Sequence, residues 1–229
     1  MERHVRLFLN RISFGSIAMA TFTLILLFLQ TPETCIPLNS PSKPHLKFPK
    51  SSCDSSPREL VSIAKKNKRL WSTNDWHKKL SSFAQLFRPI CDLGLLHNHT
   101  KVICVSAGAG HEVMALSQMG VVDVTGVELV DSPPLVSRAD PHNLPFFDHA
   151  FDLAFSAHLA EALFPSRFVA EMERAVRPKG VCVVVVEECG DEEVGEIVGL
   201  FTKSRFLDSV NVTLTGLKMT RIIMKRVSR

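Results

Sequence analysis

Two glycines at the end of an apolar run are the residues of this sequence best suited to hold a ligand. Residues 102–112 read Val-Ile-Cys-Val-Ser-Ala-Gly-Ala-Gly-His-Glu and are followed by the helix-forming residues 113–116. An apolar run that breaks into such a turn predicts a strand, a tight bend and the start of a helix. At a bend of this kind, Gly108 and Gly110 let backbone N–H groups come close to a ligand.

A carboxylate stands at the end of the next apolar run. Residues 121–127 are mostly apolar and lead into Glu128, roughly 20 residues after the glycines, where nucleotide-binding α/β folds place an acid for ribose hydroxyls. A dinucleotide-binding loop needs a third glycine where Val113 stands, and no Gly-Lys-Ser/Thr sequence follows. The pattern therefore predicts an adenosine-containing cofactor and disfavours a phosphate cradle.

The pattern continues through Asp140, the segment Asn-Leu-Pro-Phe at 143–146, the apolar run 151–155 and the Arg-Pro-Lys-Gly segment at 177–180. This order resembles the class I S-adenosylmethionine-dependent methyltransferases, in particular the small-molecule "type 11" group, over roughly the last 130 residues, a length typical of one domain. The resemblance implies a Rossmann-like, doubly wound α/β sheet and S-adenosylmethionine as the cofactor.

The resemblance also implies roles for individual residues. Gly108 and Gly110 would pass under the methionine part of the cofactor, Glu128 would hold the ribose, and Asp140 would face the adenine amino group. We expect the cofactor site to be formed by Ser106, Gly108, Gly110, Glu128, Asp140 and Leu144.

Two positions depart from the family pattern. The family usually has an acid where Ser106 stands, and many members have a further glycine where Glu112 stands. A serine can form hydrogen bonds but lacks the negative charge that favours a cationic ligand. The alternative function is therefore a catalytically inactive relative that acts as an interaction or scaffold module.

His158 is the candidate catalytic base, because it follows the strand expected at 153–156 and would lie at the carboxyl edge of the sheet. A polar loop residue without a chemical role is the alternative, and Glu187 and Glu188 are rivals for contacts with the acceptor. A sulfonium already activates its methyl group, so the protein mainly aligns donor and acceptor and excludes water. A base is needed only for a hydroxyl or ammonium acceptor. The acceptor, a small molecule or a glycan, is not specified by the sequence.

The front of the chain predicts a membrane anchor. Residues 12–29 form an uncharged, mostly aliphatic run of 18 residues behind Arg3, Arg6 and Arg11. At ~1.5 Å per residue, this run would cover roughly 27 Å, enough for an early secretory-pathway bilayer. The arginines favour a cytosolic amino terminus, so we expect a cytosolic tail at 1–11 and a signal anchor at 12–29. A cleavable signal peptide is the competing interpretation.

The topology places everything after the anchor in the lumen of the Golgi or endoplasmic reticulum. The glycosylation sequons at Asn98 and Asn211 are compatible with that location. Residues 30–57, rich in Pro, Ser and Lys, predict an extended stem. Residues 58–97 should form helices, and 98–229 the methyltransferase-like domain. An apolar helix face is predicted by the spacing of Trp76, Leu80, Phe83 and Phe87.

The expected strands lie near residues 102–106, 121–128, 135–139, 152–156 and 181–186, with a closing hairpin of 206–214 and 217–224. Only six residues separate Glu128 from Leu135, so the helix between the second and third strands should be short or missing.

Composition supports one globular domain, since 45% of the 229 residues are hydrophobic. The six cysteines show no metal-binding spacing, and no metal is expected. The net charge of +4 and the basic run 65–69 raise the question of nucleic acid, but a solvated helix face is the favoured interpretation and no nucleic-acid partner is expected.

Overall fold

The computed structural model describes residues 2–30 and 63–227, and it divides the chain into two compact units, residues 1–61 and 62–229. In the first unit it describes the helix α1 (Glu2–Gln30). Among the residues with a described structure, no helix is both long and apolar enough to cross a membrane. The span expected at 12–29 is therefore not confirmed. Residues 31–57 of the predicted stem and the helix start expected at 58 lie outside the described residues.

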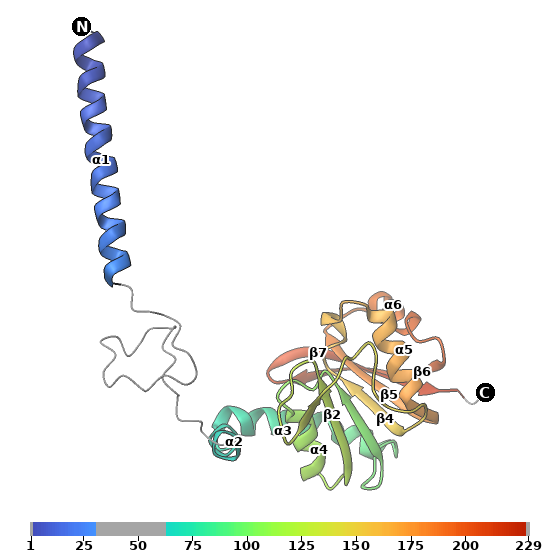
Figure 1. The fold of residues 1–229 in the computed structure, drawn as a ribbon. Coiled ribbons are helices and arrows are strands. Elements are labelled where there is room, and N and C mark those ends of the chain that lie inside the picture. The colour runs from blue at the N-terminus through green and yellow to red at the C-terminus, as the bar shows by residue number, and fades with distance from the viewer. Residues whose placement is uncertain (1, 31–62, 228–229) are drawn as a thin grey trace. The chain divides into compact units, whose positions relative to one another are not determined.

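A seven-stranded sheet forms the centre of the second unit (Figure 1). Its strands are β1 (Lys101–Val105), β2 (Asp123–Glu128), β3 (Val136–Arg138), β4 (Phe151–Ser156), β5 (Val176–Glu187), β6 (Ser204–Leu214) and β7 (Leu217–Arg226). The order is β3-β2-β1-β4-β5-β7-β6, with β7 antiparallel to both neighbours and the other pairs parallel. From β1, the strands β2 and β3 are added on one side and β4 and β5 on the other, so the strand order reverses between β1 and β4. Open α/β sheets bind ligands at such a switch point.

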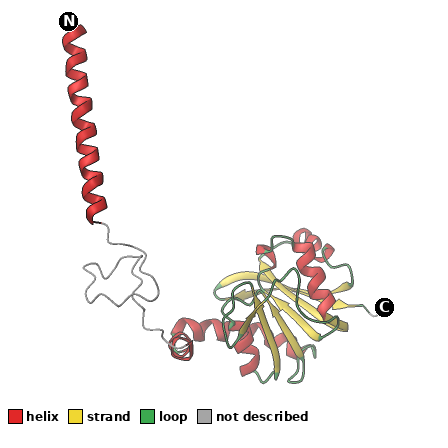
Figure 2. Cartoon of the chain, viewed as in Figure 1, coloured by secondary structure: helices red, strands yellow, loops and turns green. Residues whose placement is uncertain are grey.

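Helices cover both faces of this sheet (Figure 2). One apolar cluster contains residues of α2 (Ile63–Trp71), α3 (Asn74–Asp92) and α4 (His111–Gln118), and a second contains residues of α5 (Pro165–Ala175) and α6 (Asp191–Gly199). A single turn of 3₁₀ helix, η1 (Leu159–Glu161), follows β4. The central strands are apolar on both faces because both faces are covered. The predicted doubly wound α/β sheet is confirmed.

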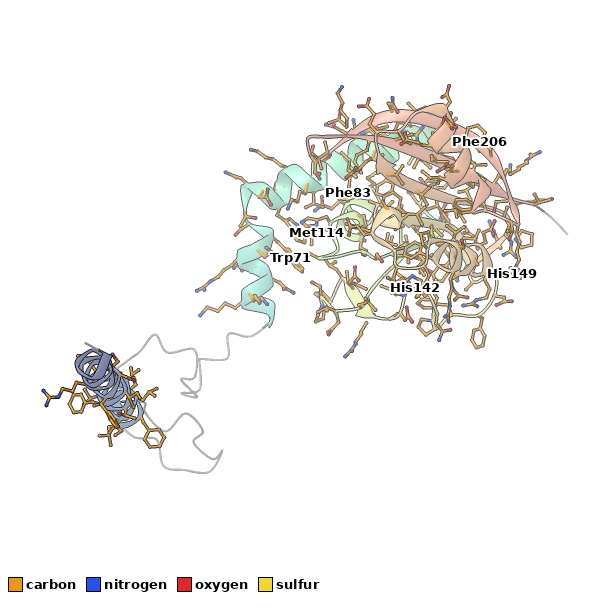
Figure 3. The ribbon with its side chains drawn as sticks, turned by 90° about the horizontal axis from the view of Figure 1, so that it is seen from above. Trp71, Phe83, Met114, His142, His149 and Phe206 are labelled. Atoms are coloured by element: carbon orange, nitrogen blue, oxygen red, sulfur yellow. The ribbon has the colours of Figure 1, made fainter. Side chains whose placement is uncertain are left out.

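Helix α3 presents the apolar face that the sequence predicts. Its amino end is capped by the Thr73 hydroxyl, which accepts a hydrogen bond from the Trp76 backbone N–H. The predicted apolar residues are all buried: Trp76, Leu80, Phe83 and Phe87. Phe83, Trp71 of α2 and Met114 of α4 belong to the same apolar cluster and are labelled in Figure 3. This packing joins the leading helices to the sheet.

The link between β2 and β3 contains no helix, as predicted. Residues 129–135 form bends and turns, and the Asn67 side-chain amide donates to the Pro133 carbonyl oxygen at 2.8 Å. The predicted hairpin is also present, with Thr215 and Gly216 at its turn in left-handed conformations. The short link and the hairpin both border the region of the site described below.

The fifth strand begins earlier than the residue 181 expected from the sequence. Residues 177–180 lie inside β5, but between the pairs Phe151–Val176 and Leu153–Val181 they stand opposite Asp152 alone. A Cβ atom on Gly180 would lie 2.5 Å from the Asp152 carbonyl oxygen, so this irregular pairing requires glycine. Pro178 and Gly180 are of residue types common in turns, and in this structure they lie in an irregular, bulged part of β5.

Candidate functional site

The bend after β1 is held by backbone hydrogen bonds. Ser106, Gly108 and Gly110 all have positive φ, at 57°, 51° and 91°. The Ala107 N–H donates to the Val127 carbonyl oxygen at 3.0 Å, and the Gly110 N–H donates to the Ala107 carbonyl oxygen at 2.8 Å. The bend is therefore fixed against the end of β2 before any ligand is present.

The two glycines of the bend have different surroundings. A Cβ atom at Gly108 would have no heavy atom within 4 Å, so this position faces open space. A Cβ atom at Gly110 would lie 2.7 Å from Leu135 Cβ and 3.0 Å from Val136 Cγ2. Gly108 leaves room for a ligand, whereas Gly110 leaves room for the segment that enters β3.

Glu128 lies beside this bend because β1 and β2 are neighbours in parallel register, with Val105 paired to Val127. One carboxylate oxygen accepts from the Gly108 N–H at 3.2 Å, and the other accepts from the Leu129 N–H at 2.8 Å. A carboxylate has about four acceptor positions, so these two bonds leave capacity for ligand hydroxyls.

A pocket of about 540 Å³ opens at the carboxyl edge of the central strands. Its wall includes Gly108 of the bend, Glu112 of α4, His158 after β4 and Glu187 at the end of β5. Ser106, Gly110 and Glu128 do not form this wall; they support the bend that does. The structure thus brings the bend and the candidate base together around one cavity.

Glu112 is the most unusual residue of the pocket wall. Its side chain is only 2% exposed, and its Oε1 atom has no hydrogen-bond partner. Burial raises the pKa of Glu112 to about 8, and the negative charge of Glu128 acts in the same direction. The carboxyl group is therefore mostly protonated at neutral pH. The sequence marks this position only as a departure from the family glycine and carries no signal of its burial.

His158 lies at the rim of the pocket. Its backbone N–H donates to the Ser156 hydroxyl at 3.2 Å, and its ring Nδ1 lies 3.2 Å from the Glu161 Oε1 atom. The carboxylate of Glu161 orients the ring through Nδ1, which leaves the other ring nitrogen, Nε2, without a role in this contact. Of its two rivals, Glu187 borders the pocket, while Glu188 faces Lys218 at 3.7 Å.

Asp140 is not brought to this pocket. Its exposed carboxylate accepts from the His142 backbone N–H at 2.8 Å, and this bond lowers the pKa of Asp140. The residue closes a local turn with Asn143.

Leu144 is also separate from the pocket and is 3% exposed in the second apolar cluster. Its backbone N–H donates to the Glu171 carboxylate at 2.8 Å, and its carbonyl oxygen accepts from Arg174 at 2.9 Å. The backbone N–H of Leu144 is therefore already used within the protein and is not available to a ligand.

Helix α3 contributes residues that the sequence did not assign to the site. Lys79 and Phe83 line the pocket, and the ring of Trp76 lies against His111, with ring centres 4.1 Å apart. The Trp76 indole N–H points to the Met114 sulfur at 3.2 Å. Helix α3 therefore forms part of the pocket wall as well as packing on the sheet.

Residues 103–184 match the profile of a protein family described as methyltransferase domain. No curated protein matches the chain. The matched segment contains the bend, Glu128, the loop with His158 and most of β5, so it covers part of the pocket wall, whereas helix α3, Glu187 and the β6–β7 hairpin contribute the rest.

Solved structures share the fold. A SAM-dependent methyltransferase from Aquifex aeolicus is 19% identical, with a TM-score of 0.54 over 73% of this chain and 100% of that chain. The Burkholderia thailandensis 1,6-didemethyltoxoflavin-N1-methyltransferase, solved with 1,6-didemethyltoxoflavin and S-adenosylhomocysteine, is 18% identical, with a TM-score of 0.52 over 73% and 84%. The [4+2]-cyclase SpnF is 15% identical, with a TM-score of 0.53 over 64% and 81%. At these identities the likeness shows the fold alone, a Rossmann-like α/β fold shared with these solved structures.

Proposed function

We propose that this chain is an S-adenosylmethionine-dependent methyltransferase. The observation that carries the proposal is the open bend at Gly108, which lies between the carboxylate of Glu128 and the pocket that contains Glu112 and His158. The domain match and the structural neighbours indicate S-adenosylmethionine as the cofactor.

The residues of the site fit this cofactor. The open space at Gly108 admits close approach to the backbone, and the buried Glu112 Oε1 atom has no partner within the protein. Glu128 retains acceptor capacity for ribose hydroxyls. When bound, the cofactor supplies a methyl group that its sulfonium has already activated. The chain itself has to hold the cofactor, orient the acceptor toward the methyl group and exclude water from the site.

His158 is the residue that we propose to remove a proton from the acceptor. Its Nδ1 atom is held by Glu161, so Nε2 can accept a proton from a hydroxyl or ammonium group in the pocket. A volume of about 540 Å³ is in the range of small-molecule sites, and we propose a small molecule or a terminal glycan group as the acceptor.

A catalytically inactive interaction module is the rival. Two features favour this rival. Ser106 lacks the negative charge of the acid that the family usually has at this position, and the space beside Gly110 is occupied by Leu135 and is not open to a ligand. The cyclase neighbour also illustrates that one fold can carry different chemistry. Calorimetric titration of the full-length chain with S-adenosylmethionine separates the two. The enzyme predicts saturable heat and a raised melting temperature, whereas no heat and no shift at millimolar cofactor would favour the rival.

Substitution of Glu128 tests the ribose contact. Glu128→Gln should weaken cofactor binding about tenfold, because the amide has one acceptor oxygen and leaves the Gly108 or Leu129 N–H without a partner. The dissociation constant is measured by calorimetry, with Glu196→Gln on the exposed side of α6 as the matched control. An unchanged dissociation constant in Glu128→Gln would remove this residue from the site.

We also propose the single-pass topology with a lumenal domain in the Golgi or endoplasmic reticulum. Its support is the uncharged run 12–29 with arginines on its amino side. In sealed microsomes, added protease should spare residues 63–227, and the exposed Asn98 should carry a glycan. Digestion of the domain without detergent would place it on the cytosolic side.

A further inference from the structure

The buried carboxyl group of Glu112 is not explained by the contacts of the protein itself. It lies in the first turn of α4, is 2% exposed, borders the pocket and has an Oε1 atom without a hydrogen-bond partner. A buried polar atom without a partner destabilises a folded protein and is rare in native structures. A carboxyl group in this position at the edge of a cavity is suited to form a hydrogen bond or an ion pair with a bound ligand.

The ionisable groups around Glu112 come from several elements. Glu128 of β2 adds negative charge, and Cys104 of β1 is a buried thiol whose pKa is raised by burial and by Glu112. His111 adjoins Glu112 on α4, and burial together with Lys79 of α3 lowers the pKa of His111, which keeps it neutral at neutral pH. The loop after β4 contributes His158.

Further along the pocket wall lie Glu161 and Glu187. The Glu161 Oε1 atom lies 3.2 Å from the His158 Nδ1 atom. With Lys79 at the rim as the positively charged residue of the wall, the pocket holds an excess of acidic groups. This balance favours a positively charged ligand.

We propose that Glu112 binds the positively charged part of the cofactor and releases its own proton to solvent as the cation enters. The inference rests on the proposed function. The charge balances: the O–H bond of the carboxylic acid breaks, one proton leaves the pocket, and the carboxylate forms an ion pair with the incoming cation. Glu112 would thereby supply, from the first turn of α4, the negative charge that Ser106 does not.

The test counts protons released on binding. The full-length chain is titrated with S-adenosylmethionine at pH 7 in two buffers with different heats of ionisation, and the difference in apparent heat gives the number of protons. With Glu112 near a pKa of 8, about 0.9 proton should be released per cofactor bound. Affinity should rise about tenfold between pH 6 and pH 7, as the ionised fraction of Glu112 increases.

Glu112→Gln should abolish both effects, and the exposed Glu196→Gln should behave as the natural chain. The histidines that face the pocket are unchanged in Glu112→Gln, so the difference between the two proteins reports Glu112 alone. S-adenosylhomocysteine has the ammonium group but no sulfonium. Proton release with both ligands assigns the ammonium as the partner of Glu112, and release with S-adenosylmethionine alone assigns the sulfonium.

Binding of S-adenosylmethionine to the natural chain without proton release at pH 7, or with the same release in Glu112→Gln, would overturn the inference and leave the proposed function intact. Absence of any binding to the natural chain would instead overturn the proposed function. The first of these results needs only the natural chain, so the inference stays testable even if the variant fails to fold.

Discussion

Glu112→Gln should raise the free energy of unfolding of the cofactor-free chain by about 3 kcal/mol at pH 7. The pKa of Glu112 is about 8 in the folded chain, against 4.5 for an unperturbed glutamate. Between these values the unfolded state binds fewer protons than the folded state, so the natural chain loses stability as pH rises from 4.5 to about 8. Glutamine has no such titration and keeps the size of the side chain.

The measurement is urea denaturation of the two proteins at pH 5 and pH 7. At pH 5 the variant should exceed the natural chain in free energy of unfolding by less than about 1 kcal/mol. The reason is that most of the stability that the natural chain loses to this titration is lost between pH 5 and pH 8. Glu196→Gln provides the control, since its carboxylate is exposed on α6 and its substitution should change stability little at either pH. A stability difference for Glu112→Gln that is the same at pH 5 and pH 7 would contradict the burial of an ionisable Glu112.

Gly110→Ala should lower the free energy of unfolding by about 3 kcal/mol. Gly110 has φ of 91°, and an added Cβ atom would lie 2.7 Å from Leu135 Cβ and 3.0 Å from Val136 Cγ2. The substitution therefore combines a backbone conformation that alanine disfavours with a steric overlap against the segment that enters β3.

Gly108→Ala is the matched control, because it lies in the same bend at φ of 51° but has no atom within 4 Å of the added Cβ position. It should lower the free energy of unfolding by only about 1 kcal/mol, from the backbone conformation alone. Both values come from urea denaturation at one pH. Equal losses for the two variants would mean that the contact with Leu135 and Val136 does not restrict Gly110.

The sheet could be predicted from the sequence because its signals are local. The buried strands β1, β4 and β5 are apolar runs, and the β6–β7 hairpin carries its turn residues at Thr215 and Gly216. The bend after β1 could be predicted as well, since glycine is the residue that adopts positive φ at the least cost and two glycines follow the apolar run. The absent helix between β2 and β3 follows from the length of that link.

The site could be predicted only in part, because several of its features depend on residues far apart in the chain. The sequence does not reveal that the Leu144 backbone N–H donates to Glu171, which lies 27 residues further along the chain. The role of Gly110 depends on Leu135, and the pocket wall includes Phe83 of α3. The burial of Glu112 likewise results from packing between elements, which a pattern of residue types does not report.

A crystal structure of the full-length chain with S-adenosylhomocysteine tests the central claim most directly. The account predicts the amino-acid part of the ligand beside Gly108 and Glu112, with the ribose hydroxyls within hydrogen-bond distance of the Glu128 carboxylate. Crystals grown with millimolar ligand that show the pocket without it, or that show its ribose away from Glu128, would contradict the account.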